Sequence, residues 1–484
     1  MAGIIQMVTN YLFAVAGRNQ EFEELIARKD IGRVKQLFTS NKEEVDEARA
    51  EYDTESHKIL NRPDKILKDK EGKRIGSVKR WKLPVGYPVY INEIALVFIF
   101  GRPVKWSQVS EGTDNAFDAY NRLIKSTRFN SKVRQCKRLA GSETQSAMLF
   151  RVFKDREGKP DCQIRVLAAS KGDEIYTRWD LYENLVSFAW GYHVKDSSQE
   201  TSYHFDIFTP DMIYRCKQVL TGWEVTPEEN PIGKIPVILF QQEKEWAGAT
   251  RLIEREEYVG SRTADTNDYF SDPKFIVDAD IIKSLPKKDD ENKTLVTKPG
   301  TKASEAAHYL TWDSAPESKK QELEWLEKHI LTKTFTPNID FDNMKGLSNV
   351  SGKALKQMML LADIKASKRK DTLDELMDRT SSLLIAIIGN VLDTSLYQEC
   401  QNLRIEHEFQ EPFGEDIAEA LDNITKAKDS GILSTETAIE LNPIVKDHLR
   451  EQERVEAEDE KTKKEQRDIF GTNQNRDDVF GGAE

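Results

Sequence analysis

The sequence is poor in cysteine and histidine, and neither residue type forms a cluster. The seven histidines form no HxxxH pair, and the four cysteines, which include no CxxC pair, are Cys136, Cys162, Cys216 and Cys400. This scatter excludes a disulfide framework and a zinc site with the usual ligand spacing. We therefore expect reduced thiols, a cytosolic site of synthesis, no structural metal and no cofactor.

Long apolar runs are also missing. No stretch stays apolar over the roughly 20 residues that a membrane-spanning helix needs. The N-terminal segment GIIQMVTNYLFAVAG lacks a basic leading region, and polar residues interrupt its apolar run. A packed or partner-facing helix is therefore expected there rather than an export signal. We expect no membrane partner.

The chain has no excess of positive charge. It carries 71 Lys and Arg against 83 Asp and Glu, which gives a formal net charge of -12. The overall basic footprint of a tight nucleic-acid binder is thus absent, although a protein that only lets DNA pass would not need one. With 484 residues, the chain is expected to divide into two or more packed units.

The segment KGLSNVSGKALKQMML, residues 345–360, looks like a phosphate-binding loop but lacks its spacing. Five residues separate Gly346 from Gly352 where the motif requires four, and Ala354 replaces the hydroxyl that would reach Mg²⁺. We therefore interpret the segment as a loop that leads into a helix, with Ser351 as its N-cap. No catalytic carboxylate pair is expected either, since neighbours such as Glu256 and Glu257 diverge on a helix.

Periodicity divides the chain into helical and β-rich parts. Residues 20–62 have helical spacing, and the polar stretch 62–81 after them is expected to be an exposed loop. An apolar helix that ends at Gly101 follows. Between about 146 and 241, short aromatic and β-branched runs separated by polar turns predict antiparallel hairpins, with NPIGKIPVILF at a sheet edge.

Two charged helices with thin apolar stripes flank a small β module. The first covers 247–270, and the second follows Pro316 and places Leu323, Leu326 and Ile330 on one face. Between them KFIVDADII and KTLVTKPG read as short strands. Such thin stripes suggest that the helices pack against copies of themselves. A long helix from about residue 352, the strand-like LRIEHEFQEP and further charged helices complete the chain.

This order of parts resembles the portal (head-to-tail connector) proteins of tailed bacteriophages over roughly residues 80–450. VSGKALKQMMLLADIKASKRKDTL is similar to the segment where that family's tunnel loop enters its long wing helix. FIFGRPVKWS is similar to the family's GkPV segment, and YHFDIFTPDMIYRCK and NPIGKIPVILF are similar to its wing strands. Each segment is weak alone, and their shared order carries the resemblance.

The resemblance implies an α+β protomer with named parts. These would be a mixed wing domain at 1–246, stem helices at 247–270 and 316–336, a small β clip at 271–315, a tunnel loop at 337–351, a long kinked wing helix with a returning strand at 352–412, and a helical crown with a polar tail at 413–484.

The resemblance also implies a structural, non-enzymatic function. Such proteins form a dodecameric ring at one capsid vertex of the virion, assembled in the bacterial cytoplasm, and double-stranded DNA is packaged and ejected through the ring. The implied partners are the terminase large subunit, the major capsid and scaffold proteins, and head-completion or tail adaptor proteins. Lys345 and Lys353 would steer DNA, and the channel-facing loop residues would be Asp342, Asn343, Met344, Lys345, Gly346, Ser348 and Asn349.

Two other functions stay open from the residues alone. A nucleotide hydrolase or nuclease of the packaging machinery would need a true phosphate-binding loop or an acidic metal cluster. A cytosolic helical scaffold would use the charged helices to bind partner helices. A ring of high mass in solution would favour the portal, whereas a monomer or dimer would favour either alternative.

Overall fold

The chain divides into two units by its internal contacts. Residues 1–350 and 354–410 form the first, and residues 351–353 and 411–484 form the second. The computed structural model describes residues 21–69, 71–195, 201–271, 274–277, 307–310, 316–339, 359–410, 412, 417–445 and parts of 450–461. The expected N-terminal helix lies outside this described part.

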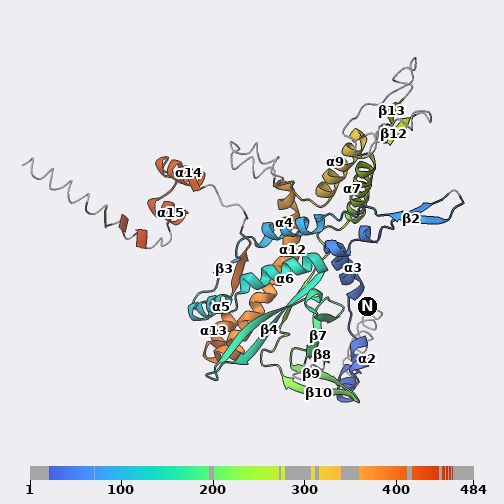
Figure 1. The fold of residues 1–484 in the computed structure, drawn as a ribbon. Coiled ribbons are helices and arrows are strands. Elements are labelled where there is room, and N and C mark those ends of the chain that lie inside the picture. The colour runs from blue at the N-terminus through green and yellow to red at the C-terminus, as the bar shows by residue number, and fades with distance from the viewer. Residues whose placement is uncertain are drawn as a thin grey trace, which may run out of the picture. The chain divides into compact units, whose positions relative to one another are not determined.

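Short helices lead the first unit, in agreement with the helical spacing of residues 20–62 (Figure 1). A helix at 21–27 precedes α2 (Ile31–Gln36) and α3 (Lys42–Tyr52), and two 3₁₀ turns follow at Thr54–Ser56 and Lys58–Asn61. The apolar residues of the first two helices pack on one face of the larger sheet, in a cluster with Tyr176, Phe205 and Ile207.

The polar stretch after these helices is not a loop, so that prediction is wrong. It forms an antiparallel hairpin of β1 (Lys65–Lys68) and β2 (Arg74–Val78), with Lys65 opposite Val78. Eight of its nine strand residues are exposed and one is half-buried. Without a buried face, the strands carry no alternation of apolar and polar residues that would reveal them in the sequence.

Three helices and a strand separate the hairpin from the sheets. The predicted apolar helix is α4 (Tyr87–Phe100), and Gly101 is its C-cap. Strand β3 (Lys105–Gln108), α5 (Asp114–Ser126) and α6 (Phe129–Glu143) follow. The sequence analysis assigned no element to these last two helices, whose buried faces include Tyr120, Leu123 and Val133.

The β-rich part forms two antiparallel sheets, as its hairpin pattern predicts. Their core between the sheets includes Leu149, Phe188 and Phe208. The smaller sheet has the order β11-β4-β5, so β11 (Val237–Gln241) is at an edge as expected. The larger sheet has the order β10-β9-β8-β7-β6. The remaining bounds are β4 Gln145–Lys154, β5 Pro160–Leu167, β6 Glu174–Trp179, β7 Leu185–Lys195, β8 Thr201–Phe208, β9 Met212–Val219 and β10 Gly222–Glu229.

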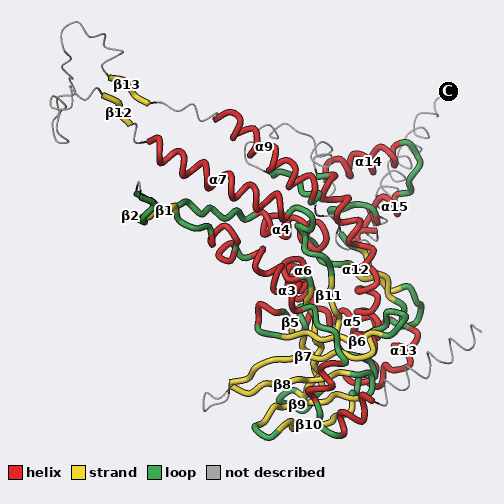
Figure 2. Tube along the Cα trace, turned by 90° about the vertical axis from the view of Figure 1, so that its right-hand side faces the viewer, coloured by secondary structure: helices red, strands yellow, loops and turns green. Residues whose placement is uncertain are grey.

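The two charged helices form as predicted and lie side by side (Figure 2). They are α7 (Thr250–Ser271) and α9 (Pro316–Lys333), which contact each other and are joined by an ion pair between Arg255 and Glu322. Beyond them β12 (Lys274–Val277) pairs antiparallel with β13 (Ala307–Leu310). The expected strand in KTLVTKPG lies outside the described residues, and the strand paired with β12 comes from later in the chain.

The long helix is α12 (Leu360–Ile387), which continues as a π-helical turn over Ile388–Leu392. A 3₁₀ turn (Thr394–Leu396) and α13 (Tyr397–Asn402) follow after a bend of 120°. The predicted returning strand is β14 (Ile405–Glu408), which pairs with β3. The expected start of the long helix at residues 352–358 lies outside the described part.

In the second unit, α14 (Ile417–Asp429) and α15 (Thr435–Glu440) are described, with helical turns between residues 450 and 461. Among the described helices, none alone combines the length and the apolar composition of a membrane-spanning helix. The bent pair Leu360–Leu392 and Thr394–Asn402 meets these criteria jointly, and its residues Leu383, Leu384 and Ile387 are buried within the chain.

Candidate functional site

The sequence places its candidate site between α9 and α12. Residues 340–358 lie outside the described part of the chain, and with them every predicted loop and DNA-steering residue: Asp342, Asn343, Met344, Lys345, Gly346, Ser348, Asn349 and Lys353. Their roles therefore stay predictions. The described residues on both sides show how the ends of this segment are attached.

The end of α9 is closed by a compact threonine turn. Thr334 and Thr336 are both buried. The Thr334 hydroxyl donates to the Ile330 carbonyl at 2.9 Å, and the Thr336 backbone N–H donates to the Leu331 carbonyl at 2.9 Å. Phe335 between them has a φ of 52°, in the left-handed region that side chains rarely adopt. The helix therefore stops sharply, and the chain leaves it in a fixed direction.

Tyr90 of α4 holds the residues that follow this turn. Its hydroxyl donates to the Pro337 carbonyl at 2.7 Å and accepts from the Ile339 backbone N–H at 3.0 Å. The Asn338 side chain donates to Glu327 Oε1 of α9 at 3.0 Å. A single side chain thus fixes Pro337 and Ile339, the first and last described residues of the predicted tunnel loop, on the apolar helix α4.

The start of α12 is anchored on the connection between β11 and α7. Met359 and Ala362 are 6% and 2% exposed. From the next turn, Lys365 Nζ donates to the Glu245 carbonyl oxygen at 3.0 Å and lies 3.0 Å from Glu245 Oε2. Arg369 Nη2 donates to the Glu243 carbonyl at 3.2 Å. Both ends of the undescribed segment are therefore held by packed, hydrogen-bonded residues.

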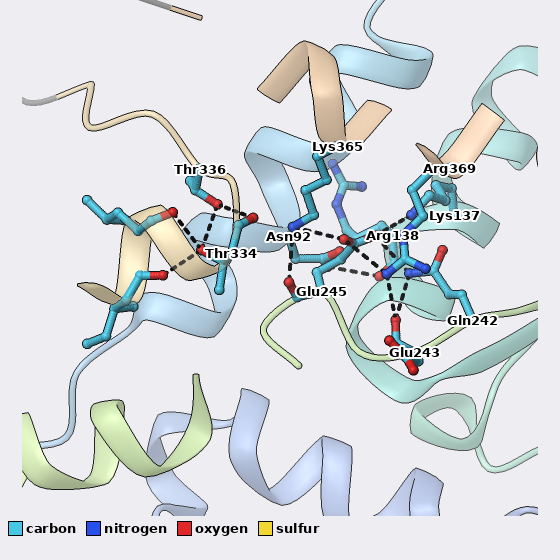
Figure 3. A network of polar contacts seen from close by, with 12 residues as sticks. Asn92, Lys137, Arg138, Gln242, Glu243, Glu245, Thr334, Thr336, Lys365 and Arg369 are labelled. Carbon is cyan, nitrogen blue, oxygen red and sulfur yellow. Dashed lines mark hydrogen bonds and ion pairs between the residues drawn. The ribbon is translucent and has the colours of Figure 1, made fainter. Parts of the chain in front are cut away.

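Glu245 is the centre of a buried ionic cluster, which we define as Glu245 with its three cations Lys137, Lys365 and Arg369 (Figure 3). Lys137 Nζ of α6 lies 2.6 Å from Glu245 Oε1, and both side chains are at most 1% exposed. Gln242 Nε2 donates to the same oxygen at 2.8 Å. The ionic cluster joins α6, α12 and the segment that enters α7.

The charge of this carboxylate is set by its three cations. Burial alone would raise the pKa of Glu245, but the attraction of Lys137, Lys365 and Arg369 outweighs it and holds the pKa far below its ordinary value. The Glu245 carboxylate is therefore ionised at neutral pH. Removal of that single negative charge would leave a buried ammonium group unpaired.

A close approach of backbone and side chain supports the ionic cluster. Asn92 of α4 donates to the Arg138 carbonyl of α6 at 2.9 Å. A Cβ placed on Gly141 of α6 would lie 1.9 Å from Asn92 Oδ1 and 3.1 Å from Glu245 Cγ. A side chain at position 141 would therefore force the Asn92 side chain away from its hydrogen bond to the Arg138 carbonyl. The position therefore couples the packing of α4 on α6 to the placement of Glu245.

Helix α7 is also attached to the segments that precede and follow the β1–β2 hairpin. His57 Nδ1 and Glu257 Oε1 lie 2.5 Å apart, and both side chains are at most 5% exposed. The same Glu257 oxygen accepts from the Val85 backbone N–H at 2.9 Å. The hydrogen bond to Glu257 raises the pKa of His57 above its ordinary value, against the effect of burial. α7 is thus held to the segments on both sides of the hairpin.

Adjacent Glu256 points to a different partner, as neighbouring positions on a helix require. It accepts from the Tyr87 hydroxyl at 2.9 Å. Burial raises the pKa of the Glu256 carboxyl to about 7, the hydrogen bond from Tyr87 opposes this, and the Glu327 carboxylate of α9 adds to it. Between pH 4.5 and about 7 the folded chain therefore binds a proton that the unfolded chain has released, so stability falls as the pH rises through this window.

Glu256→Gln is accordingly expected to stabilise the chain at high pH only. The variant should raise the midpoint of thermal unfolding at pH 8, by an amount worth about 1 kcal/mol after allowance for the partial exposure of the group. At pH 4 it should change little. Thermal melts at both pH values check this, with Glu324→Gln on the exposed face of α9 as the matched control. An equal gain at pH 4 and pH 8 would contradict the role of the Glu256 charge.

The described residues offer no obvious catalytic chemistry. No group of three or more His, Cys, Asp or Glu in the described ranges is placed to hold a metal ion. All four thiols are buried, and burial raises the pKa of Cys136, Cys162 and Cys216 to about 12. A thiol with such a pKa is a poor nucleophile at neutral pH.

The sequence analysis missed the residues that anchor the loop. Tyr90, Glu245 and Lys365 lie far apart in the sequence, and the partners of Glu245 come from positions 137, 365 and 369. One weak signal existed: Gln242 to Trp246 reads QEKEW, a charged run directly before a predicted helix, in which Glu245 and Trp246 are buried.

Three of the solved structures that the chain resembles come from gene transfer agent (GTA) particles. The neck of the native GTA particle computed with C12 symmetry has 11% identity and a TM-score of 0.39, with 74% of this chain and 91% of that chain covered. The virion of the native particle and the neck of the empty particle computed with C6 symmetry have 10% identity, the same coverage, and TM-scores of 0.38 and 0.36. No curated protein sequence matches the chain.

The family assignment comes from the sequence as a whole. The family model described as "Phage portal protein, SPP1 Gp6-like" matches residues 31–465, which is most of the chain. The match includes the two sheets, α7, α9, α12 and the candidate loop, and it confirms the family that the ordered segments resemble. The chain therefore belongs to the SPP1 Gp6-like phage portal protein family.

Proposed function

We propose that this chain forms a ring-shaped channel at one capsid vertex, through which double-stranded DNA is packaged and ejected. The observation that carries the proposal is the family match over residues 31–465. The portal family is structural, and we propose no catalytic activity for this member. The protein would be located in the virion, after assembly in the cytoplasm of a bacterial host.

The arrangement of α7, α9 and α12 supports a channel. The paired helices α7 and α9 would be the stem, the β12–β13 pair would belong to the clip, and residues 337–351 would be the tunnel loop. Tyr90 and the ionic cluster hold the two ends of the loop segment on packed helices. A loop with rigid ends can contact a passing duplex without disturbing the fold behind it.

The charge of the chain also supports translocation rather than tight binding. With a net charge of -12, the walls of a channel built from this chain would repel phosphates and leave the counterions of DNA in place. Lys345 and Lys353 would then steer the duplex by position and charge, without reading its sequence. Asp342, Asn343, Met344, Gly346, Ser348 and Asn349 would complete the channel-facing loop.

The remaining partners follow from the same proposal. A dodecamer would close by head-to-tail contacts between copies. The clip would dock the terminase large subunit and later the head-completion or tail adaptor proteins, while the wing at 1–246 and 352–412 would face the major capsid and scaffold proteins. The crown at 413–484 would lie at the capsid interior.

Replacement of residues 342–349 by a Gly-Ser linker of equal length tests the proposal. Rings should still form, because these residues lie outside the packed anchors at Thr336–Ile339 and Met359, and thermal stability should change by less than about 1 kcal/mol. The defect should appear as capsids that contain the portal but fail to package or retain DNA. Negative-stain images of the purified rings and the DNA content of capsids are the two measurements.

A matched control places the same linker in an exposed turn far from α9. It replaces Asp155 to Lys159, between β4 and β5, together with enough flanking residues to equal the number replaced in the loop variant. That variant should both assemble and package. A wild-type chain that stays monomeric, or that hydrolyses ATP, would overturn the channel in favour of a scaffold or a motor. Normal packaging by the loop variant would show that 342–349 do not line the channel.

A further inference from the structure

The β1–β2 hairpin exposes apolar side chains on both of its faces. Ile66 lies on one face and is 52% exposed, and Ile75, which has no strand partner at the register shift in β2, is 66% exposed. Leu67 and Val78 lie on the other face and are 38% and 48% exposed. A two-stranded hairpin with no covering helix or third strand is marginal in water. We therefore expect another protein surface to cover the apolar side chains of the hairpin in the assembled protein.

The hairpin is nevertheless rigidly held at its base. The Arg62 guanidinium, 8% exposed, lies 2.7 Å from Asp265 Oδ2 of α7 and also donates to the Trp81 carbonyl at 2.9 Å. The Trp81 backbone N–H donates to Asp265 Oδ1 at 2.8 Å. Two residues that bracket the hairpin thus share one carboxylate. These contacts at its base fix the direction in which the exposed hairpin extends from the protein.

Charge distinguishes the hairpin from the rest of the chain. Residues 62–82 contain nine Lys and Arg against three Asp and Glu, a net charge of +6, whereas the whole chain carries -12. The opposite pattern occurs at α3, where residues 42–56 contain seven Asp and Glu against two Lys and Arg, a net charge of -5. Glu43, Glu44 and Asp46 are exposed on α3.

The hairpin does not meet the α3 of its own chain. It extends away from that helix to the side of α7 (Figure 1). The basic hairpin and the acidic face of α3 lie at different places on one chain. The hairpin of one copy can therefore pair with the α3 of another copy by opposite charge. A contact of this kind is heterologous, and it forms a ring when its rotation closes after a whole number of copies.

We propose that the β1–β2 hairpin docks on the acidic face of α3 in a neighbouring copy of this chain. The proposal rests on the ring of the proposed function and names one of its contacts. Lys68 and Arg74, which are paired on one face of the hairpin, would face Glu43, Glu44 and Asp46 of the neighbour, and Ile66 on the same face would be covered at the same time. Opposite charges select the partner and its register, while apolar burial supplies most of the affinity.

DNA is the other partner that a basic hairpin can bind. The apolar pairs favour protein, because phosphate contact needs only position and charge. Four exposed branched aliphatic residues within two strands would remain uncovered on a duplex.

Two hairpin variants and one rescue test the contact in the full chain. Ile66→Ser with Ile75→Ser, and separately Lys68→Glu with Arg74→Glu, should weaken ring assembly by about tenfold or more, as loss of interface anchors does. Their melting temperatures should stay at the wild-type value, since these side chains are exposed. Glu43→Lys with Glu44→Lys should restore rings to the charge-reversed hairpin. Leu220→Ser, at the fully exposed turn between β9 and β10, is the matched control.

Mass photometry across a dilution series measures the assembly, and duplex binding is measured in parallel. Normal rings from both hairpin variants would overturn the contact while leaving the channel standing. Weakened assembly that the α3 reversal does not restore would overturn α3 as the acceptor. Intact rings with a loss of DNA binding would assign the hairpin to DNA. A wild-type chain that forms no ring would overturn both the contact and the proposed function.

Discussion

Glu245→Ala is expected to destabilise the chain by about 3–5 kcal/mol, because it leaves buried cations without their partner. Lys137 is 1% exposed and has Glu245 as its ion-pair partner at 2.6 Å. Its ammonium group would have to lose its proton or draw water into the interior, and both are costly. Thermal and denaturant unfolding of the purified chain measure the loss.

The control and the rescue separate charge from packing. Glu243→Gln removes an exposed carboxylate two residues away but keeps the backbone carbonyl that accepts from Arg369, so its stability should match the wild type. Glu245→Leu with Lys137→Met replaces the ion pair by apolar side chains and should recover most of the stability. Lys365 and Arg369, at 11% and 22% exposure, can turn to solvent in that variant. A Glu245→Ala variant as stable as wild type would show that the ionic cluster contributes nothing.

The consequence for the candidate loop follows from the same geometry. Lys365 lies one and a half turns into α12 and contacts both the carbonyl and the carboxylate of Glu245. Loss of Glu245 should therefore loosen the start of α12, where the loop segment ends. Hydrogen exchange should be faster in the first turns of α12 than in its buried last turns near Leu384 and Ile387.

Local patterns sufficed where a residue's partners are close in sequence. Gly101 predicts the end of α4, and the turn between β4 and β5 predicts that hairpin, because a helix C-cap and a tight turn depend on neighbouring residues. The hairpin at 65–78 was missed for the opposite reason. Its strands are exposed on both faces, so no burial pattern marks them.

The anchors of the candidate site depend on distant residues. Tyr90 contacts residues 337 and 339 across roughly half the chain, and nothing near Tyr90 in the sequence indicates this. Glu245 collects cations from α6 and α12. These anchors form only when particular helices pack together. The amphipathic pattern of each helix shows which of its faces is buried, but it does not show which helix packs against that face. The family resemblance predicts a channel loop between these anchors, and that loop stays a prediction because residues 340–358 lie outside the described part of the chain.

The thin apolar stripes of α7 and α9 suggested contacts between copies, but part of each stripe is used within one chain. Leu326 and Ile330 of α9 are 2% and 0% exposed. Ile330 lies in a cluster with Ile91, Trp246 and Ile253, which brings α4 and α7 together with α9. These residues therefore hold α9 against α4 and α7 within one chain.

Leu326→Asp is accordingly expected to disrupt the protomer itself, at a cost of about 3–5 kcal/mol for the lost apolar burial and the unpaired carboxylate. The matched control is Trp325→Asp on the same helix. Trp325 is 52% exposed and stacks on His329 of its own helix at 4.0 Å between ring centroids, so the control should melt close to the wild type. Thermal unfolding and the mass of each variant in solution separate the two effects. A Leu326→Asp chain that melts normally but fails to form rings would place this residue at an interface between copies.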